Sequence, residues 1–383
     1  MLEKALSGNR RYWMWIFALL SLAGIGTICY LWQFVYGLGI TGLSRDVSWG
    51  LYMSQFTFLV GVAASAVMVV IPYYLHNYKA FGKITILGEF LAVSSIIMCI
   101  LFIFVDMGQP IRVLNVVLHA TPNSIIFWDV VVLNGYLFLN LLIGWTVLGS
   151  EYKGVAPPTW LKPFIYISIP WAVGIHTVTA FLFSGLPGRH FWLSAIMAAR
   201  FLASAFACGP ALLIILCLIV RKYSKFDPGR EAIRTLGKIV TYGMITNVFF
   251  LGLELFTALY SNIPGHRHSF EYLYVGLDGH GELVFLMWVS AILALASLVL
   301  LINPKTRDNE KTLTIACLAV FGSLLIEKGF GLMVGGFIPN PFEKVTAYWP
   351  TLPEVLISLG IWSIGLLILT VLYKIVVSVK TGR

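Results

Sequence analysis

Charged residues are scarce in this sequence: Asp, Glu, Lys and Arg make up 11% of the 383 residues, whereas hydrophobic residues make up 59%. A chain so poor in charge, with a mean hydropathy of +0.87, lies outside the range of soluble globular proteins. Cysteine is scarce as well. The five cysteines all fall inside apolar runs and show no C-x-x-C spacing. The sequence therefore predicts neither an iron–sulfur cluster nor a disulfide framework within this chain.

Long apolar runs occupy most of the chain. A helix needs about 20 apolar residues to cross a hydrocarbon core of ~30 Å. Ten runs reach that length, at residues 12–38, 51–77, 84–107, 124–150, 161–186, 190–221, 237–262, 281–303, 311–330 and 352–378. The sequence therefore predicts an all-α integral membrane protein with ten transmembrane helices, located in the cell membrane.

The basic residues are distributed unevenly between the predicted loops. The two termini and the loops after even-numbered helices carry 19 of the 26 Lys and Arg residues, and the other seven, which include Arg112, Arg200 and Lys328, lie elsewhere. The positive-inside rule then places both termini in the cytoplasm. The net charge of +9 is explained by this topology, so nucleic-acid binding need not be invoked.

A weak internal repeat divides the chain into two similar parts. Trp49 precedes a run of small residues around Gly61 to Ser65, and Trp192 precedes a similar run around Ala203 to Ala207. The repeat predicts a single membrane domain with four parts: an N-terminal helix (1–40), a four-helix bundle of helices 2–5 (45–186), a second bundle of helices 6–9 (187–330), and a C-terminal loop and helix (331–383). Ordinary helix packing, which favours small residues, produces the same pattern.

A short polar segment between the third and fourth apolar runs, called the polar crossing, carries the clearest functional signal. Asp106 ends the third run, Asp129 lies just inside the fourth, and Pro110, Arg112 and Asn123 lie between them. Ionisable groups at membrane depth are costly and often mark a functional site. The alternative is that both carboxylates are interfacial residues wetted by headgroup water.

Counting from the basic helix ends places further polar residues in the outer half of the membrane. His176 lies 14 residues beyond Lys162, and Glu254 and Glu327 each lie 16 residues beyond a basic helix start, which is roughly 20–24 Å at 1.5 Å per residue. Glu282 opens helix 8, and Arg200 lies three turns into helix 6. Two interpretations of Arg200 and Glu254 remain open, a buried ion pair, which is slightly favoured, and direct contact with a ligand.

One face of the second helix matches the needs of a quinone. Tyr52, Gln55 and Phe56 are spaced i, i+3 and i+4, so they offer a hydroxyl, an amide and an aromatic wall on one side. His176 is the intramembrane candidate for exchanging protons with the ring. The alternative for His176 is a structural histidine that bonds to a neighbouring helix. Glu89, Glu254, Glu282 and Glu327 are candidates for a proton path, or are separate structural carboxylates.

The histidine pattern argues against haem. Only His176 is deep enough to be an axial ligand, because the other six lie in loops or at helix ends: His76, His119, His190, His266, His268 and His280. We therefore expect no haem and no dedicated metal site. The outer loops, above all 108–123 and 263–280, are thinly charged and rich in Pro, aromatic and His residues, which suits the docking of a partner.

Four stretches resemble the membrane subunits of the NrfD and polysulfide reductase (PsrC-like) family. They are W-G-L-Y at Trp49, D-M-G-Q-P-x-R at Asp106, P-N-S-I-I-F-W-D ending at Asp129, and I-H-T-V-T-A-F around His176. The stretch at 186–206, L-P-G-R-H-F-W-L-S-A-I-M-A-A-R-F-L-A-S-A-F, resembles the DsrP-type subunits of sulfite-reduction-associated DsrMKJOP complexes, and the similarity covers nearly the whole chain.

The resemblance implies a membrane subunit of an oxidoreductase complex that exchanges electrons between menaquinone or menaquinol and a periplasmic ferredoxin-like iron–sulfur subunit (DsrO-like). It implies further partners: a multihaem cytochrome c (DsrJ-like), a haem b membrane subunit (DsrM-like) and an iron–sulfur subunit (DsrK-like). The resemblance places the quinone site at Trp49 to Phe56 and on the other helices of the first bundle, where His176 lies. Together with the polar residues identified above, the predicted site residues are Trp49, Tyr52, Gln55, Phe56, Asp106, Asp129, His176 and Arg200. At the place of His176, relatives often carry another polar side chain such as tyrosine.

Two alternatives remain open at this point. The chain could serve another oxidoreductase of the same family, such as a HybB-like hydrogenase subunit, which also has ten helices. A secondary transporter would also show an internal repeat and charges within the membrane. The sequence shows no clearly broken pair of helices at matched positions, and the polar residues lie toward one side, so it favours the quinone-binding subunit.

Overall fold

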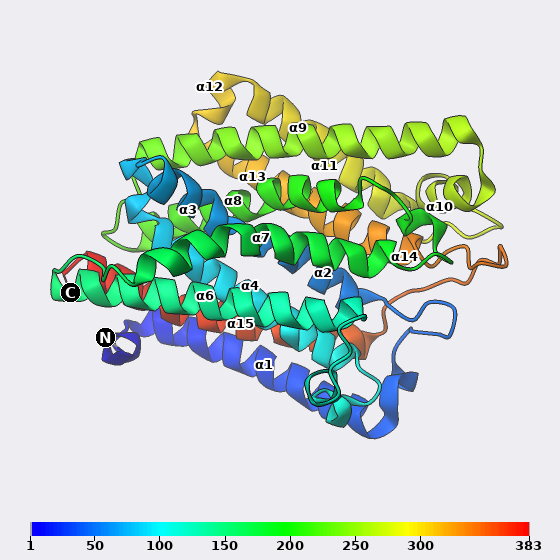
Figure 1. Cartoon of the computed structure of the whole chain (residues 1–383), viewed down its shortest axis with the longest axis horizontal. Helices are drawn as coiled ribbons and strands as arrows, with labels where there is room; N and C mark the ends of the chain where they lie inside the picture. Colours follow the sequence, from blue (N-terminus) through cyan, green and yellow to red (C-terminus); the bar gives the residue numbers. More distant parts are fainter. Residues whose placement is uncertain (1, 383) are drawn as a thin grey trace.

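The computed structural model describes residues 2–382, and within them it shows ten helices that are long and apolar enough to cross a membrane. The helices run side by side along the long axis of the molecule, and the two termini lie at the same end (Figure 1). No strand forms within these residues. The prediction of an all-α protein with ten transmembrane helices is confirmed.

The first five spans contain six long or medium helices. Their bounds are α1 (Arg10–Tyr36), α2 (Leu51–Ala63), α3 (Ser65–Val70), α4 (Thr85–Asp106), α6 (Ile125–Lys153) and α7 (Leu161–Ser184). Short helical turns connect them: η1 (Leu2–Leu6), η2 (Gly37–Ile40), η3 (Ile71–Leu75), η4 (Lys79–Lys83), η5 (Pro110–Arg112) and α5 (Asn115–Leu118).

The last five spans follow in the same way. Their bounds are α8 (Met197–Tyr223), α9 (Arg230–Ser261), α11 (Val284–Ile302), α13 (Glu310–Leu324) continued by η7 (Leu325–Gly331) and α14 (Leu332–Gly335), and α15 (Leu352–Lys380). The connecting segments contain η6 (His190–Trp192), α10 (Pro264–Tyr274) and α12 (Pro304–Arg307).

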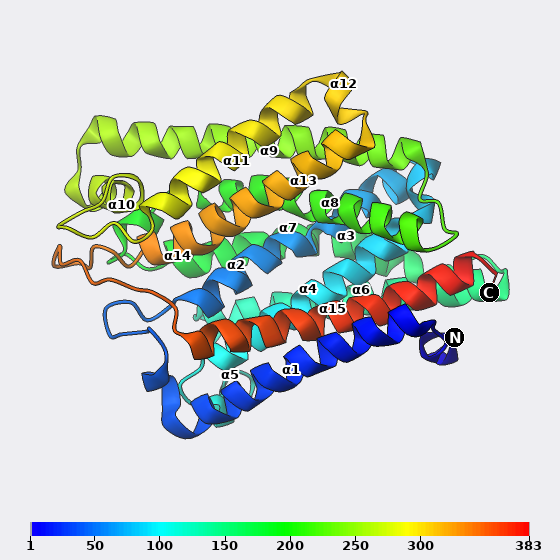
Figure 2. The same cartoon turned by 180° about the vertical axis from the view of Figure 1, so that it is seen from behind.

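The packing order follows the chain in two groups. In the first, α4 contacts α2 and α6, and α6 contacts α7. In the second, α8 contacts α9 and α13, and α11 contacts α9 and α13. Helix α2 joins the groups through α8 and η7, while α1 packs on α15, which in turn covers α4 (Figure 2).

Local signals in the sequence explain several helix ends. The side chain of Asn9 accepts a hydrogen bond from Tyr12 N at the start of α1, and Thr351 and Glu354 form a capping box at the start of α15. Gly154 ends α6 with a φ of 66°, a left-handed conformation that favours glycine. These caps satisfy backbone groups that the helix itself leaves unpaired.

Small residues set the spacing between the two groups of helices. A Cβ atom added to Gly209 of α8 would lie 2.8 Å from the Ser65 nitrogen of α3, and one added to Gly61 of α2 would lie 3.0 Å from Cys208 Sγ. The same principle joins the flanking helices, because a Cβ on Gly26 of α1 would lie 2.6 Å from Gly360 Cα of α15. Small residues of this kind allow membrane helices to approach closely.

Two spans contain an irregular turn that hydropathy does not reveal. The second span is interrupted at Ala64 between α2 and α3, and the ninth changes to a π-helix at η7. Helix α2 contacts η7 directly. π-helical turns inside α-helices occur frequently at functional sites.

The helix bounds also differ from the apolar runs at three places. Residues 190–192 form the separate turn η6, so the sixth span begins only at Met197. Helix α9 begins at Arg230, although the predicted apolar run begins at residue 237. The run is shorter than the helix because the first turns of α9 are polar. Within the predicted outer loop 263–280, α10 forms with Pro264 in its first turn and buries Phe270 and Leu273.

Candidate functional site

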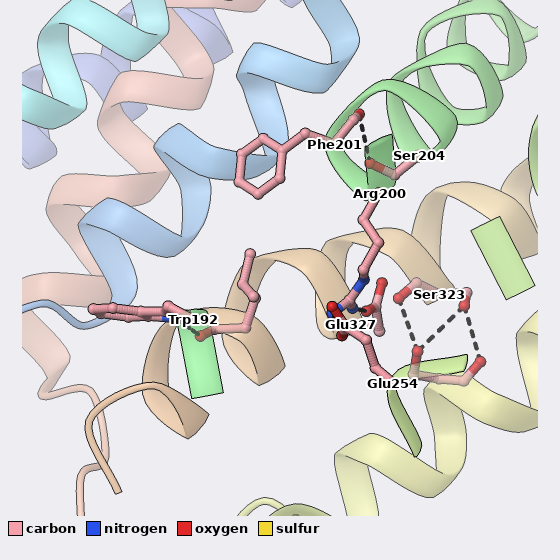
Figure 3. A network of polar contacts seen from close by, with 9 residues as sticks. Trp192, Arg200, Phe201, Ser204, Glu254, Ser323 and Glu327 are labelled. Carbon is pink, nitrogen blue, oxygen red and sulfur yellow. Dashed lines mark hydrogen bonds and ion pairs between the residues drawn. The ribbon is translucent and has the colours of Figure 1, made fainter. Parts of the chain in front are cut away.

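An arginine and two glutamates form a buried cluster, the Arg200 triad. Arg200 of α8 pairs with Glu254 of α9 through one guanidinium nitrogen and with Glu327 of η7 through another. Figure 3 shows the Arg200 side chain pointing toward both carboxylates, with Ser323 beside them. The ion pair between Arg200 and Glu254 is present as predicted. Glu327 joins the pair from η7, a turn that packs against α2 and α11.

Two small hollows flank the contact between Arg200 and Glu327. Ser204, Asn247 and Lys328 contribute polar groups to one, and Leu251, Tyr274 and Met287 help to line the other. Each has room for about one water molecule. Neither hollow accommodates a quinone ring, but the polar one is suited to hydration.

His176 is a fully buried residue of α7. Its side chain has 0% exposure, and neither ring nitrogen has a hydrogen-bond partner within residues 2–382. Buried polar groups are nearly always hydrogen-bonded. Both ring nitrogens of His176 are therefore available to bond to a ligand or water.

A carboxylate of α6 is hydrogen-bonded to the face of α7 that carries this histidine. Thr179 stands three residues after His176 on α7 and donates a hydrogen bond of 2.7 Å to Asp129 Oδ1 on α6. Asp129 is 4% exposed. Residues spaced i and i+3 on a helix are neighbours, so His176, Thr179 and Asp129 form one polar cluster in which the carboxylate and the imidazole can both exchange protons.

Lys328 extends from η7 toward the same region. It is 3% exposed, and its ammonium stands 4.4 Å from the centre of the Phe201 ring. It acts electrostatically on His176 of α7 and on Cys99 of α4. The lysine therefore reaches from the second group of helices into the first.

Tyr52 and Gln55 use their polar groups within the chain. The Tyr52 hydroxyl donates a hydrogen bond of 2.6 Å to Gln33 Oε1 on α1, and Gln55 Oε1 accepts one of 2.9 Å from Trp362 Nε1 on α15. Phe56 is fully buried beside them. This face of α2 points toward the flanking helices, and the structure does not bring it together with the Arg200 triad.

Asp106 belongs to a separate polar cluster at the ends of α1, α2, α4 and α15. Its Oδ1 is buried without a partner in the described chain, and Asp106 and Glu354 are the carboxylates that act on Tyr52. Glu354 is fully buried and accepts hydrogen bonds from the Tyr348 hydroxyl and from Gly42 N. The two aspartates of the polar crossing thus lie in different clusters.

Trp49 is part of an aromatic cluster next to the start of α2. Its ring lies 5.8 Å from Phe183, 5.9 Å from Trp192 and 5.8 Å from Phe337. The Trp192 indole donates a hydrogen bond to Leu332 O, which links this cluster to α14. The two tryptophans that mark the internal repeat therefore meet in space.

The remaining candidates for a proton path lie in different parts of the fold. Glu89 of α4 is buried with both carboxylate oxygens unpartnered in residues 2–382. Glu282 lies before α11 and pairs with His280 at 2.9 Å. Partial burial is the largest single influence on the pKa of Glu282 and acts to raise it. The hydrogen bonds from His280 and the backbone, together with the charge of His280 and the nearby Tyr272 hydroxyl, outweigh burial, so the pKa lies below its ordinary value.

Sequence reasoning missed several polar residues of these clusters. Lys328 was visible as a basic residue inside an apolar run, a signal that favours function. Thr179 could have been found from its i+3 spacing to His176. Gln33 and Glu354 gave no signal, because their roles depend on which helix packs against which. Among residues 2–382, no group of three or more His, Cys, Asp or Glu side chains is placed to hold a metal ion.

Comparison with known proteins gives consistent relatives. The chain is 26% identical to a protein of Halobacterium salinarum that is named as a membrane component of dimethyl sulfoxide reductase, over 94% of this chain and 89% of the relative. It is 22% identical to the Hdr-like menaquinol oxidoreductase integral membrane subunit of Archaeoglobus fulgidus, over 88% and 83%. It is 19% identical to the menaquinone reductase, integral membrane subunit, of Nitratidesulfovibrio vulgaris, over 95% and 91%.

The family assignment rests on a match to a whole family rather than to single proteins. Residues 39–339 match the family described as polysulphide reductase, NrfD, which covers every span except α1 and α15. Together with the ten apolar helices, this match establishes a multi-pass integral protein of the cell membrane. The chain belongs to the polysulphide reductase NrfD family.

Proposed function

We propose that this protein binds menaquinone or menaquinol within the membrane and exchanges electrons between the quinone pool and an iron–sulfur partner. Two relatives are named for menaquinol or menaquinone. The observation that carries the proposal is His176, which is fully buried with both ring nitrogens unpartnered in the described chain, next to the pair of Asp129 and Thr179.

The proposed ring site is centred on His176 and Asp129. His176 would bond to a ring oxygen and exchange a proton with it, and Asp129 would supply or accept the next proton. Trp49, whose ring packs on Phe183 of α7, would contribute an apolar wall of the kind that encloses bound rings. Because His176 has no exposed surface, binding requires the side chains that cover it to move.

In this proposal, the other residues predicted for the quinone site support the surrounding helices and do not contact the ring. Tyr52 and Gln55 hold α1 and α15 against α2 through their hydrogen bonds, and Asp106 borders the same cluster. Arg200 stabilises its two glutamates. These groups shape the site without touching the ring.

We propose that protons move through a subset of the buried carboxylates. Glu89 has the strongest support, because its oxygens are unpartnered in the described chain and lie near the start of α4. Glu254 and Glu327 border a hollow with room for water, and Glu282 lies at the far end of the bilayer from Glu89. The ion pairs with Arg200 favour a structural role for Glu254 and Glu327.

The proposed topology has two four-helix bundles, α2–α7 and α8–α14, flanked by α1 and α15. Both termini would be cytoplasmic, since the loops at their end carry most of the basic residues. The opposite end would then carry the partner surface. It exposes Ile111 and Leu118 in the 108–123 loop and Val275 in the 263–280 segment.

The partner in this proposal is a periplasmic ferredoxin-like iron–sulfur subunit. The DsrP resemblance supports an assembly with DsrO-, DsrJ-, DsrM- and DsrK-like subunits and a link to sulfite or sulfur metabolism. Relatives named for dimethyl sulfoxide and selenate reductases point to other assemblies. Crosslinking and mass spectrometry of the native complex distinguish these assemblies, and crosslinks of the iron–sulfur partner to the 222–238 loop would contradict the proposed orientation.

A secondary transporter is a weaker alternative. The break at Ala64 and the π-helix at η7 are interruptions of the kind seen in transporters. However, they fall in the first helix of one group and the last helix of the other, whereas inverted repeats place such breaks at matched positions. Purification separates the two functions, because an electron-transfer subunit retains quinone and redox partners.

The replacement of His176 by phenylalanine tests the proposal. Phenylalanine keeps an aromatic ring of similar bulk but removes hydrogen bonding and proton exchange, which typically contribute about 10² to 10⁴ in rate. Quinone-linked electron transfer by the purified complex should fall by that order while assembly is retained. His76→Phe, at an exposed histidine at the opposite end of the helices from the proposed partner surface, is the matched control. Wild-type turnover in an assembled His176→Phe complex would show that His176 only fills space.

A further inference from the structure

Lys328 is a buried cation whose bonding capacity is largely unused. Its Nζ donates a single hydrogen bond within residues 2–382, to Phe201 O at 3.4 Å. An ammonium has three donors. Removing a cation from water costs several kcal/mol unless its partners compensate. The face of the Phe201 ring compensates in part, but two donors of an ammonium that is 3% exposed still lack an oxygen or nitrogen acceptor within the described chain.

The chain makes room for this ammonium at the junction of the two groups of helices. The π-helical turn η7 carries Glu327 and Lys328 in sequence, and Glu327 pairs with Arg200. The absence of a side chain at Gly61 of α2 leaves space, since a Cβ there would lie 3.0 Å from Lys328 Nζ. The lysine is therefore fitted into the α2–α8 contact rather than displaced to the membrane surface.

The groups around Lys328 come from four helices. Cys208 and Arg200 of α8, Cys99 of α4 and Glu327 of its own turn act on its ammonium electrostatically, and Lys328 acts on His176 of α7. With Arg200, Glu254 and Glu327, Lys328 forms a set of two cations and two carboxylates, whose formal charges sum to zero. The ammonium is therefore balanced in charge, while its hydrogen bonds are not.

Two sets of unfilled hydrogen-bonding groups lie in the same region. The Lys328 ammonium stands over the Phe201 ring, which packs at 5.8 Å on Phe183, two turns after His176 on the same face of α7. The imidazole of His176 has two unpartnered nitrogens in the described chain, and the ammonium of Lys328 has two unused donors. We propose that Lys328 donates a hydrogen bond to the quinone oxygen that His176 also contacts, so that the second group of helices supplies one ligand of the ring. This inference rests on the proposed function.

The consequence is a site that favours negative charge on that oxygen. A preorganised cation in a water-poor site stabilises charge that develops on a bound oxygen. Charge-assisted hydrogen bonds are also roughly twice as strong as neutral ones. Lys328 would therefore tighten the binding of ligands that carry a partial negative charge at this oxygen.

Binding of the quinol analogue 2-heptyl-4-hydroxyquinoline N-oxide to the purified complex provides the test. Its dissociation constant, measured by fluorescence quenching, should rise about 10- to 100-fold in Lys328→Met, the loss expected for one hydrogen bond to a charged group. Lys328→Arg should retain most of the affinity. Lys344→Met, which removes an exposed loop lysine, is the control and should bind as the wild type does.

An infrared measurement on the wild-type complex provides a second readout that needs no variant. With menaquinone labelled by ¹³C at one carbonyl or the other, one carbonyl stretch should be shifted to lower frequency by the two donors, and Lys328→Met should partly reverse that shift. If Lys328→Met fails to assemble, two unshifted carbonyl bands in the wild type would still overturn the inference.

The outcomes separate this inference from the proposed function. Unchanged inhibitor affinity and an unchanged carbonyl band in Lys328→Met, in a complex that binds quinone, would refute the role of Lys328 and leave quinone binding standing. A wild-type complex that neither retains quinone nor binds the inhibitor would contradict the proposed function, and the inference with it.

Discussion

Replacing Arg200 by methionine should destabilise the protein severely. The arginine pairs with both Glu254 and Glu327, and all three side chains are less than 10% exposed. Removing one partner of a buried ion pair typically costs about 3–5 kcal/mol, because an uncompensated charge remains in the interior. Since a folded domain is stable by only about 5–15 kcal/mol, the loss is a large fraction of the total.

The structure also specifies how this loss can be reversed. Arg200→Met leaves Lys328 as the only cation against two carboxylates of the set, a net charge of −1. The double variant Arg200→Met with Glu254→Gln restores a net charge of zero, so it should recover part of the stability. The ion pair would then be shown to act through charge balance rather than through the bulk of the arginine.

The assay is thermal stability by fluorescence-detected size-exclusion chromatography of the tagged protein in detergent. Arg45→Met is the control, because Arg45 lies in an outer loop with a side chain that is 95% exposed. We expect the melting temperatures in the order control, double variant, single variant. Equal stability of Arg200→Met and the control would refute the reasoning, and so would a double variant that is less stable than the single one.

Three further predictions follow from other parts of the structure. Tyr52→Phe leaves Gln33 Oε1 without its donor, so the melting temperature should fall by the equivalent of about 1–3 kcal/mol while quinone affinity changes little; a specific loss of affinity would instead place Tyr52 at the ring. Glu282 has a pKa below its ordinary value of 4.5, so its stabilising contribution is complete above pH 4.5 and is lost as the pH falls through the lowered pKa. Hydrogen exchange of the 276–284 segment should therefore accelerate in acid in the wild type, and Glu282→Gln should remove that part of the pH dependence. The purified subunit without partners should show no visible haem absorbance, and a stoichiometric b-type spectrum would overturn the argument from histidine depth.

The sequence predicted the number of helices because the length of an apolar run is set by the thickness of the bilayer. It also predicted the pair of Arg200 and Glu254, since counting along two helices places both at a similar depth. The third member, Glu327, was placed at the same depth but not in the same cluster. Depth gives a position along the membrane normal, whereas a contact also requires the rotation of each helix.

The face of α2 shows the same limit. Tyr52 and Gln55 do share a side of the helix, as their spacing requires. Their partners are nevertheless Gln33 of α1 and Trp362 of α15, which lie 19 and 307 residues away in the sequence. Helix periodicity identifies a polar face, but it contains no information on which neighbour covers that face.

Lys328 illustrates a third reason why the sequence alone does not predict the contacts of a buried residue. Its burial was visible in the sequence, but its direction depends on η7, where the π-helical turn changes the angle at which successive side chains leave the helix. The space that receives its ammonium depends on Gly61, in another helix. Neither the local pattern around residue 328 nor the hydropathy of its span contains this information.

The most direct test of quinone binding at His176 is an experimental structure of the native complex with menaquinone bound. We predict a ring oxygen within hydrogen-bond distance of a His176 nitrogen, between α2, α6 and α7. A ring bound instead beside Tyr52 and Asp106, or in the second group of helices near Glu254 and Glu282, would contradict the central claim.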